Sequence, residues 1–144
     1  MFDRTITLFC YHEKTNMWNA TTIPGVTVKN VRSSDLTING IKSTDEVKFI
    51  IQCDENRKLR TEDGVKKYIE PKAYNKADDI SDKITFNPER DFIYIGKWED
   101  TQNISADTYE NGLYDAMNRE YDNVFLVSSF AVYGLLPHME VGGK

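Results

Sequence analysis

The stretch DLTINGIKSTDEVKFIIQCD, residues 35–54, contains the clearest strand pattern of the chain. Every second residue from Val47 through Phe49 and Ile51 to Cys53 is apolar, which is the period of a half-buried strand. The Asn39-Gly40 pair upstream tolerates positive φ angles and predicts a tight turn. The stretch therefore predicts a strand next to a tight turn, a local pattern typical of sheet proteins.

Related patterns occur on both sides of this stretch. Ile6, Leu8 and Cys10 fall on one face of a predicted strand, and the apolar run near the C-terminus is typical of a strand covered on both faces. The further predicted strands are Thr5–His12, Trp18–Val31 with a turn at Pro24-Gly25, Ile84–Phe86, Phe92–Trp98 and the apolar run from Val124 that Pro137 ends.

Three segments differ from these strands. Asp54–Val65 is rich in charge and predicts a loop, and Pro71 predicts the start of a short helix. Apolar residues at three- and four-residue spacing predict one long helix over Ser105–Tyr121, with Ser105 or Asp107 as its N-cap and Glu110 completing a capping box with Asp107. The expected fold is α+β and mostly antiparallel β: a small, partly closed β-barrel or sheet with one long helix in the C-terminal half.

The composition fits a single domain over residues 1–144, with 40% hydrophobic and 28% charged residues. A net charge of −5 argues against nucleic-acid binding, and we interpret the basic cluster Arg57–Arg60 with Lys66-Lys67 as a solvated loop. The N-terminal segment does not resemble a signal peptide, and no apolar run reaches the about 18 residues of a membrane span. Two cysteines are too few for a secreted disulfide framework, which favours a reducing intracellular origin.

The densest group of charged and turn-forming residues is at Asn87–Asp91, where Glu89 and Asp91 flank Arg90. Two carboxylates around an arginine raise the question of acid–base catalysis, which needs carboxyl groups held in a pocket with separated pKa values. Asn-Pro followed by charged residues is a turn opener, and side chains in a turn meet water. We therefore interpret Asn87–Asp91 as a bend.

Cysteine and histidine offer the other candidate chemistry. Cys10 and His12 share a strand face, so a thiol–imidazole nucleophile or half a zinc site is conceivable. Cys53 and His138 would have to arrive from distant segments without a metal-binding spacing, and Cys10 and Cys53 sit at apolar strand positions. Ser128 and Ser129 lack the flanking glycines of a nucleophile elbow, and Gly142-Gly143 is a two-residue tail, not a phosphate loop.

Trp18, Trp98 and the tyrosines are expected in the core or at interfaces, since no basic groove accompanies them. The residues thus predict no catalytic, cofactor-binding or metal-binding site.

The order of elements resembles small proteins from the head–tail gene cluster of tailed phages and Gram-positive prophages: head-completion, head–tail adaptor or minor capsid proteins. Within the resemblance, a strand–turn–strand motif corresponds to Asp91, Ile93 and Gly96, and the closest likeness is to an uncharacterised phage-encoded family ending near Gly134–His138. The matching pieces are ITLFCYHEK, DEVKFIIQCD, KKYIEPKAYN, the hairpin ITFNPERDFIYIGKW and NVFLVSSFAVYGLLPHMEVGGK.

The resemblance implies a non-enzymatic ring subunit, a small β-barrel closed by its C-terminal strand, located in the virion and in the host cytoplasm before assembly. Its partners would be further copies and other virion proteins, portal and tail, with no membrane and no specific nucleic acid. The contact surfaces expected are Asp54–Val65, Asn87–Asp91 and the C-terminal tail. Two rival hypotheses stay open: a small-ligand or protein binding module with Trp18, Tyr94 and Trp98 at a barrel mouth, and an enzyme using Cys10, His12 and a carboxylate.

Overall fold

The structure is a computed structural model. It describes the backbone of residues 4–37, 40–99, 103–109 and 112–144, and the side chains of these ranges outside residues 30–45. No helix within these ranges is long and apolar enough to cross a membrane.

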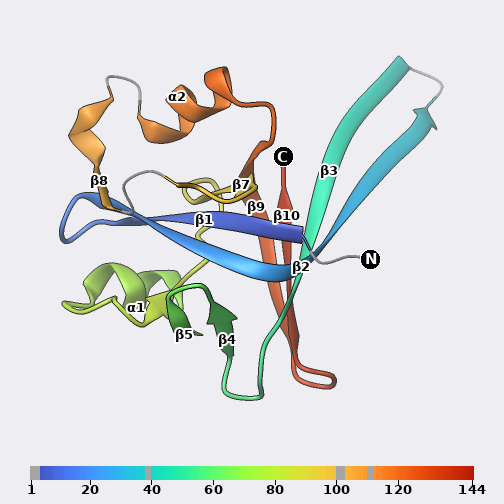
Figure 1. Cartoon of the computed structure of the whole chain (residues 1–144). Coiled ribbons are helices and arrows are strands. Elements are labelled where there is room, and N and C mark those ends of the chain that lie inside the picture. The colour runs from blue at the N-terminus through green and yellow to red at the C-terminus, as the bar shows by residue number, and fades with distance from the viewer. Residues whose placement is uncertain (1–3, 38–39, 100–102, 110–111) are drawn as a thin grey trace.

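Six antiparallel strands form a closed barrel (Figure 1). They pair in the order β1-β7-β9-β10-β3-β2, and β2 pairs back with β1 to close the ring. A short strand, β8, adds to β2 outside the ring. The strands are β1 (Arg4–His12), β2 (Met17–Thr37), β3 (Gly40–Gln52), β7 (Phe92–Ile95), β8 (Asn103–Ser105), β9 (Val124–Tyr133) and β10 (His138–Gly143). The antiparallel β-barrel is confirmed, and its C-terminal strand takes part in the closure.

β2 serves two partners in succession. Its first half, Met17–Val26, pairs with β1, and its second half, Thr27–Thr37, pairs with β3. The register shifts at Pro24-Gly25, where Gly25 has a φ of 68° and β2 gains one residue over β1. Such a bulge bends a strand without ending it, so the predicted turn is a bend inside one long strand.

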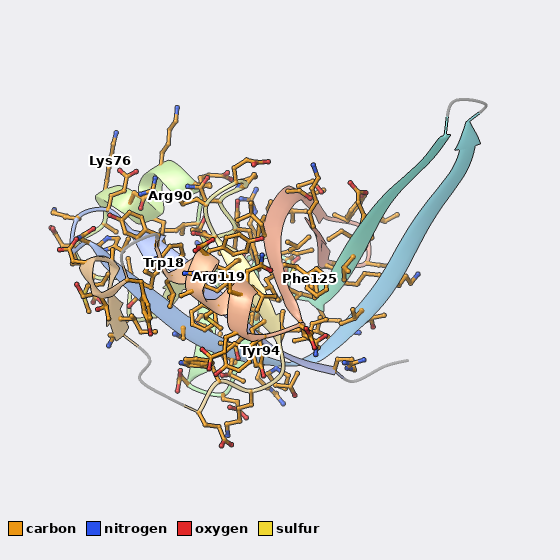
Figure 2. All side chains as sticks on the ribbon, turned by 90° about the horizontal axis from the view of Figure 1, so that it is seen from above. Trp18, Lys76, Arg90, Tyr94, Arg119 and Phe125 are labelled. Carbon is orange, nitrogen blue, oxygen red and sulfur yellow. The ribbon has the colours of Figure 1, made fainter. Side chains whose placement is uncertain are left out.

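The outer parts of β2 and β3 leave the barrel as a two-stranded arm (Figures 1 and 2). The β3–β10 pairing begins at Val47, so from the Val31–Glu46 pair outward each strand of the arm pairs only with the other within the described backbone. Thr37 pairs with Gly40 at the far end. The turn predicted at Asn39-Gly40 includes Asn39, which lies outside the described residues.

A small second sheet corrects the predicted loop over Asp54–Val65. β4 and β5 form an antiparallel hairpin, and β6 joins β5 in parallel. Leu59 and Thr61 are buried while Lys58 and Arg60 are exposed, so the charged positions concealed a period-two strand. Next to this sheet, the helix predicted at Pro71 is confirmed. The elements are β4 (Lys58–Thr61), β5 (Gly64–Tyr68), α1 (Pro71–Lys76) and β6 (Lys83–Ile84).

The long helix predicted over Ser105–Tyr121 is wrong. The segment contains the end of β8, a 3-10 turn η1 (Ala106–Thr108) and the eight-residue helix α2 (Leu113–Glu120). Gly112 precedes α2 with a φ of 91°, a conformation that a continuous right-handed helix cannot contain. Ser105 caps η1 by accepting from the Asp107 amide at 3.3 Å, while the partner Glu110 of the predicted capping box lies outside the described residues.

The predicted hairpin over Ile84–Trp98 is also wrong, because β6 and β7 belong to different sheets. β6 pairs with β5, whereas β7 lies between β1 and β9 in the barrel. Gly142 and Gly143, predicted as a tail, lie in β10 and pair with β3. The apolar run from Val124 is a strand, but Ser129, Ala131 and Tyr133 in its second half are exposed.

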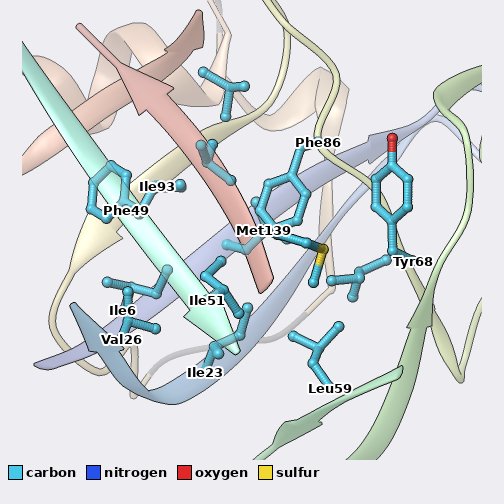
Figure 3. Close-up of a cluster of buried hydrophobic side chains, with 14 of the residues drawn as sticks. Ile6, Ile23, Val26, Phe49, Ile51, Leu59, Tyr68, Phe86, Ile93 and Met139 are labelled. Carbon is cyan, nitrogen blue, oxygen red and sulfur yellow. The ribbon is translucent and has the colours of Figure 1, made fainter. Parts of the chain in front are cut away.

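Two hydrophobic clusters hold these elements together. Ile6, Leu8 and Cys10 point into the barrel, as predicted, and Figure 3 shows Phe49, Ile51 and neighbouring side chains filling it. A second cluster lies on the opposite face of β1 and β7, under α2. Its buried members are Phe9, Trp18, Ala20, Phe92, Leu113, Met117 and Val124. A six-stranded barrel has little room beyond its own side chains, and this one is packed.

Candidate functional site

The turn Asn87–Asp91, expected as a bend, is a bend with one charged group turned inward. The Asp91 amide donates to the Asn87 carbonyl at 2.9 Å, and Glu89 and Arg90 are exposed. Asp91 is 0% exposed, so the expectation that all three charged side chains meet water is wrong for this residue. Its carboxyl oxygens accept from the backbone amides of Tyr11 at 3.0 Å and Asn87 at 2.9 Å.

Burial has a large electrostatic consequence for this carboxyl. Desolvation raises the pKa of Asp91 to about 7, although the amides of Tyr11 and Asn87 and the Arg90 guanidinium act in the opposite direction. Arg90 itself lies over the Tyr11 ring at 4.2 Å and points outward (Figure 2). Because its two oxygens accept from the Tyr11 and Asn87 amides and the side chain is closed to solvent, Asp91 ties the turn to β1.

Cys10 and His12 are both buried on β1, but their side chains form hydrogen bonds with different residues. The Cys10 thiol donates to the Thr85 carbonyl at 3.1 Å, and burial raises its pKa well above the ordinary value, which keeps it a neutral thiol. The His12 ring contacts the Thr15 hydroxyl through Nδ1 and the Ala77 carbonyl through Nε2, both at 2.8 Å. The thiol–imidazole pair of the rival enzyme hypothesis is therefore not assembled in this structure.

His138 lies at the start of β10, and its contacts are with residues other than Cys10 and His12. Its ring stacks on Tyr133 at 4.7 Å, with Nδ1 2.8 Å from the Leu136 carbonyl and Nε2 3.1 Å from the Glu140 carboxylate. Cys53 follows β3 and is a free, half-buried thiol. Across the described ranges, no group of three or more His, Cys, Asp or Glu side chains is arranged to hold a metal ion.

The aromatic residues proposed for a barrel mouth pack on the outer face of the barrel. The ring centroids of Trp18 and Phe92 are 5.2 Å apart. The Trp98 ring centroid lies 6.1 Å from that of Tyr94 and 5.9 Å from that of Tyr121. Figure 2 shows Trp18 and Tyr94 among the side chains near α2. These rings form the second cluster, as core residues do, and Trp18 is buried.

One exposed apolar feature was not predicted from the sequence. Leu135 and Leu136 are 91% and 84% exposed at the tip of the β9–β10 hairpin, next to the half-exposed Tyr133. Two adjacent leucines in a turn, without a charged neighbour between Tyr133 and Pro137, are the signal that identifies it. Together with the arm, this tip gives the chain two projecting elements.

We expect His138 to titrate above its ordinary pKa. Both ring nitrogens face acceptors, so the doubly protonated ring satisfies both, and the Leu136 carbonyl and Glu140 raise the pKa. NMR titration of the ring protons measures this value. Glu140→Gln should lower it, while Glu62→Gln on the β4–β5 hairpin should leave it unchanged, and equal values in all three proteins would contradict the assigned contacts.

The chain matches the model of a protein family. The model of a family of unknown function, DUF6751, matches residues 1–144. No curated protein and no solved structure matches the chain.

Proposed function

We propose, from its sequence and architecture, that this chain is a non-enzymatic structural protein of the head–tail connection of a tailed phage or prophage. The chain belongs to DUF6751, a family of unknown function. It acts through contacts with other copies in a ring and with portal and tail proteins. Its place is the virion, after assembly in the host cytoplasm. The observation that carries the proposal is the arm formed by β2 and β3.

The arm is not self-sufficient as a folded unit. A two-stranded ribbon is marginally stable in water, and from the Val31–Glu46 pair outward the arm contains no third strand within the described backbone. Both of its long edges carry backbone amides and carbonyls without a strand partner, which is the arrangement that adds to a neighbouring sheet. A partner protein would cover these edges and stabilise the ribbon.

The rest of the architecture supports contact over catalysis. The barrel interior is filled by side chains, and the candidate reactive groups Cys10, His12 and Asp91 are buried and bonded within the fold. In a ring each copy makes the same contact, so weak individual interfaces add up around the closed assembly. A rigid barrel carrying a projecting arm suits this use.

An arm deletion tests the proposal. Asn30 and Val47 are register partners, so Val31–Glu46 can be replaced by an Asn-Gly turn that joins them directly. We expect the natural chain to form ring-sized species, alone or with phage portal and tail proteins, and the arm-deleted chain to form none. Light scattering over a concentration series and negative-stain images measure this.

The control for the arm deletion is Val65→Ser, which changes an exposed apolar residue outside the arm and should leave assembly intact. Far-UV circular dichroism and thermal unfolding report whether the barrel remains folded. The proposal fails if the natural chain yields no species larger than two copies with its partners present. It also fails if the arm-deleted chain assembles equally well.

A further inference from the structure

The β9–β10 hairpin presents a pair of leucines in a fixed conformation. Tyr133 pairs with His138, and the turn between them contains Leu136 with a φ of 55°. This left-handed conformation is unfavourable for a residue other than glycine. It is held by the contact of the His138 ring with the Leu136 carbonyl and by the stacking of the same ring on Tyr133.

Leaving the two leucines in water forgoes a large stabilisation. Burying a leucine side chain is favourable because its apolar surface is removed from water. Leu135 and Leu136 are 91% and 84% exposed, so they gain almost none of this stabilisation from contacts within their own chain. Isolated exposed apolar residues are ordinary, but an adjacent pair on a braced turn is typical of a contact site.

A complementary hollow lies on the same chain. It measures about 530 Å³ and is lined by Ile23, Pro24, Gly25, Ile51, Gln52 and Arg60, from β2, β3 and β4. Ile23 and Ile51 line the hollow and are buried. Figure 3 shows their side chains in the core near Leu59. Pro24, Gly25 and Arg60 are exposed on its rim. Its size falls in the range of pockets that take apolar ligand groups.

The register places this hollow at the hairpin end of the barrel. Ile51 pairs with Met139 and Gln52 pairs with His138, so the floor adjoins the base of the β9–β10 hairpin. The tip itself stays exposed and does not fill the hollow of its own chain. Two copies that face each other with these ends can therefore each offer a tip and receive one.

We propose that two copies of this chain pair by exchanging hairpin tips, with Leu135 and Leu136 of each copy entering the hollow between β2, β3 and β4 of the other. The contact is reciprocal, because tip and hollow lie at the same end, and it closes at two copies. The pairing does not depend on the arm or on a virion.

The test uses the arm-deleted chain, so that assembly through the arm does not obscure pairing through the tip. Sedimentation equilibrium from micromolar to millimolar concentrations should give a mass of two copies. Leu135→Ser with Leu136→Ser should weaken the pair about 10,000-fold, since the exchange loses two leucine contacts from each copy and each contact is expected to cost about one factor of ten. Gln52→Trp, which fills the hollow from its edge, should weaken it as well.

Val65→Ser is the matched control, because Val65 is 61% exposed but belongs to neither tip nor hollow. It should pair like the parent chain. An arm-deleted chain that stays monomeric throughout the series overturns the inference, as does a Leu135/Leu136 double variant that pairs normally. Either result leaves the ring proposal standing if the natural chain still assembles with portal and tail proteins, so the two failures are distinguishable.

Discussion

Replacing Phe92 by alanine is expected to lower the free energy of unfolding by about 3–5 kcal/mol. Phe92 is fully buried on β7, with its ring stacked on Phe9 at 4.7 Å and in contact with Trp18 at 5.2 Å and Tyr114 at 5.4 Å. The substitution leaves a cavity between the barrel wall and α2 and removes three aromatic contacts at once. Urea unfolding followed by far-UV circular dichroism measures the loss.

The matched control for Phe92→Ala is Leu135→Ala, which also shortens an apolar side chain but at a 91% exposed position. Measured at concentrations where the chain is monomeric, it should change stability by no more than about 0.5 kcal/mol. If Phe92→Ala costs no more than this control, the second cluster does not pack α2 against the barrel as described.

Stability is expected to fall as the pH rises from 5 to 8, and Asp91 is expected to cause most of that fall. Its ordinary pKa of 3.8 is raised by burial to about 7 in the folded chain. Below pH 3.8 the carboxyl is protonated in both states, and its contribution to stability is fully present. Between the two values only the unfolded chain ionises, so stability is lost as the pH rises through the folded pKa.

The size of this effect follows from the pKa difference. One pKa unit corresponds to about 1.4 kcal/mol, so the part of the interval above pH 5 gives a loss of about 2–3 kcal/mol. This direction is opposite to ordinary acid denaturation, in which ion-paired carboxylates lose stability as the pH falls. Urea unfolding at pH 5 and pH 8 measures the difference.

Asp91→Asn isolates the contribution of this side chain. The amide keeps the shape and one acceptor but cannot ionise, so its stability should vary less between pH 5 and 8 than that of the natural chain. The variant should also be less stable at pH 5, by about 1–3 kcal/mol, because one buried backbone amide loses its acceptor. Parallel pH dependences in the two proteins would contradict a buried Asp91 with a raised pKa.

The barrel strands were the predictable part of the fold. Period-two alternation identified the buried faces of β1 and β3, because Ile6, Leu8, Phe49 and Ile51 face a common interior. The helix prediction failed because β8, η1 and α2 all contribute apolar side chains to one cluster, and their spacing imitated a single stripe. Gly112 was the local sign of the break.

The inward turn of Asp91 was not predictable from its neighbours. Asn87–Asp91 has the composition of a solvated bend, and the amide that fixes Asp91 belongs to Tyr11, 80 residues away in the chain. The arm was equally hidden. Its sequence predicts strands and a turn, but nothing local shows that the ribbon continues beyond the point where β10 begins to pair. Such properties depend on which strands meet, and that is decided by the whole chain.

The division of β2 between two partners makes the length of the arm independent of the barrel. Its first half belongs to the barrel seam with β1, and its second half runs outward with β3. Each residue added to both outer halves would lengthen the ribbon by about 3.3 Å, and additions in twos would keep every side chain on its original face. The length of the arm can therefore change while the residues that fill the barrel interior stay the same.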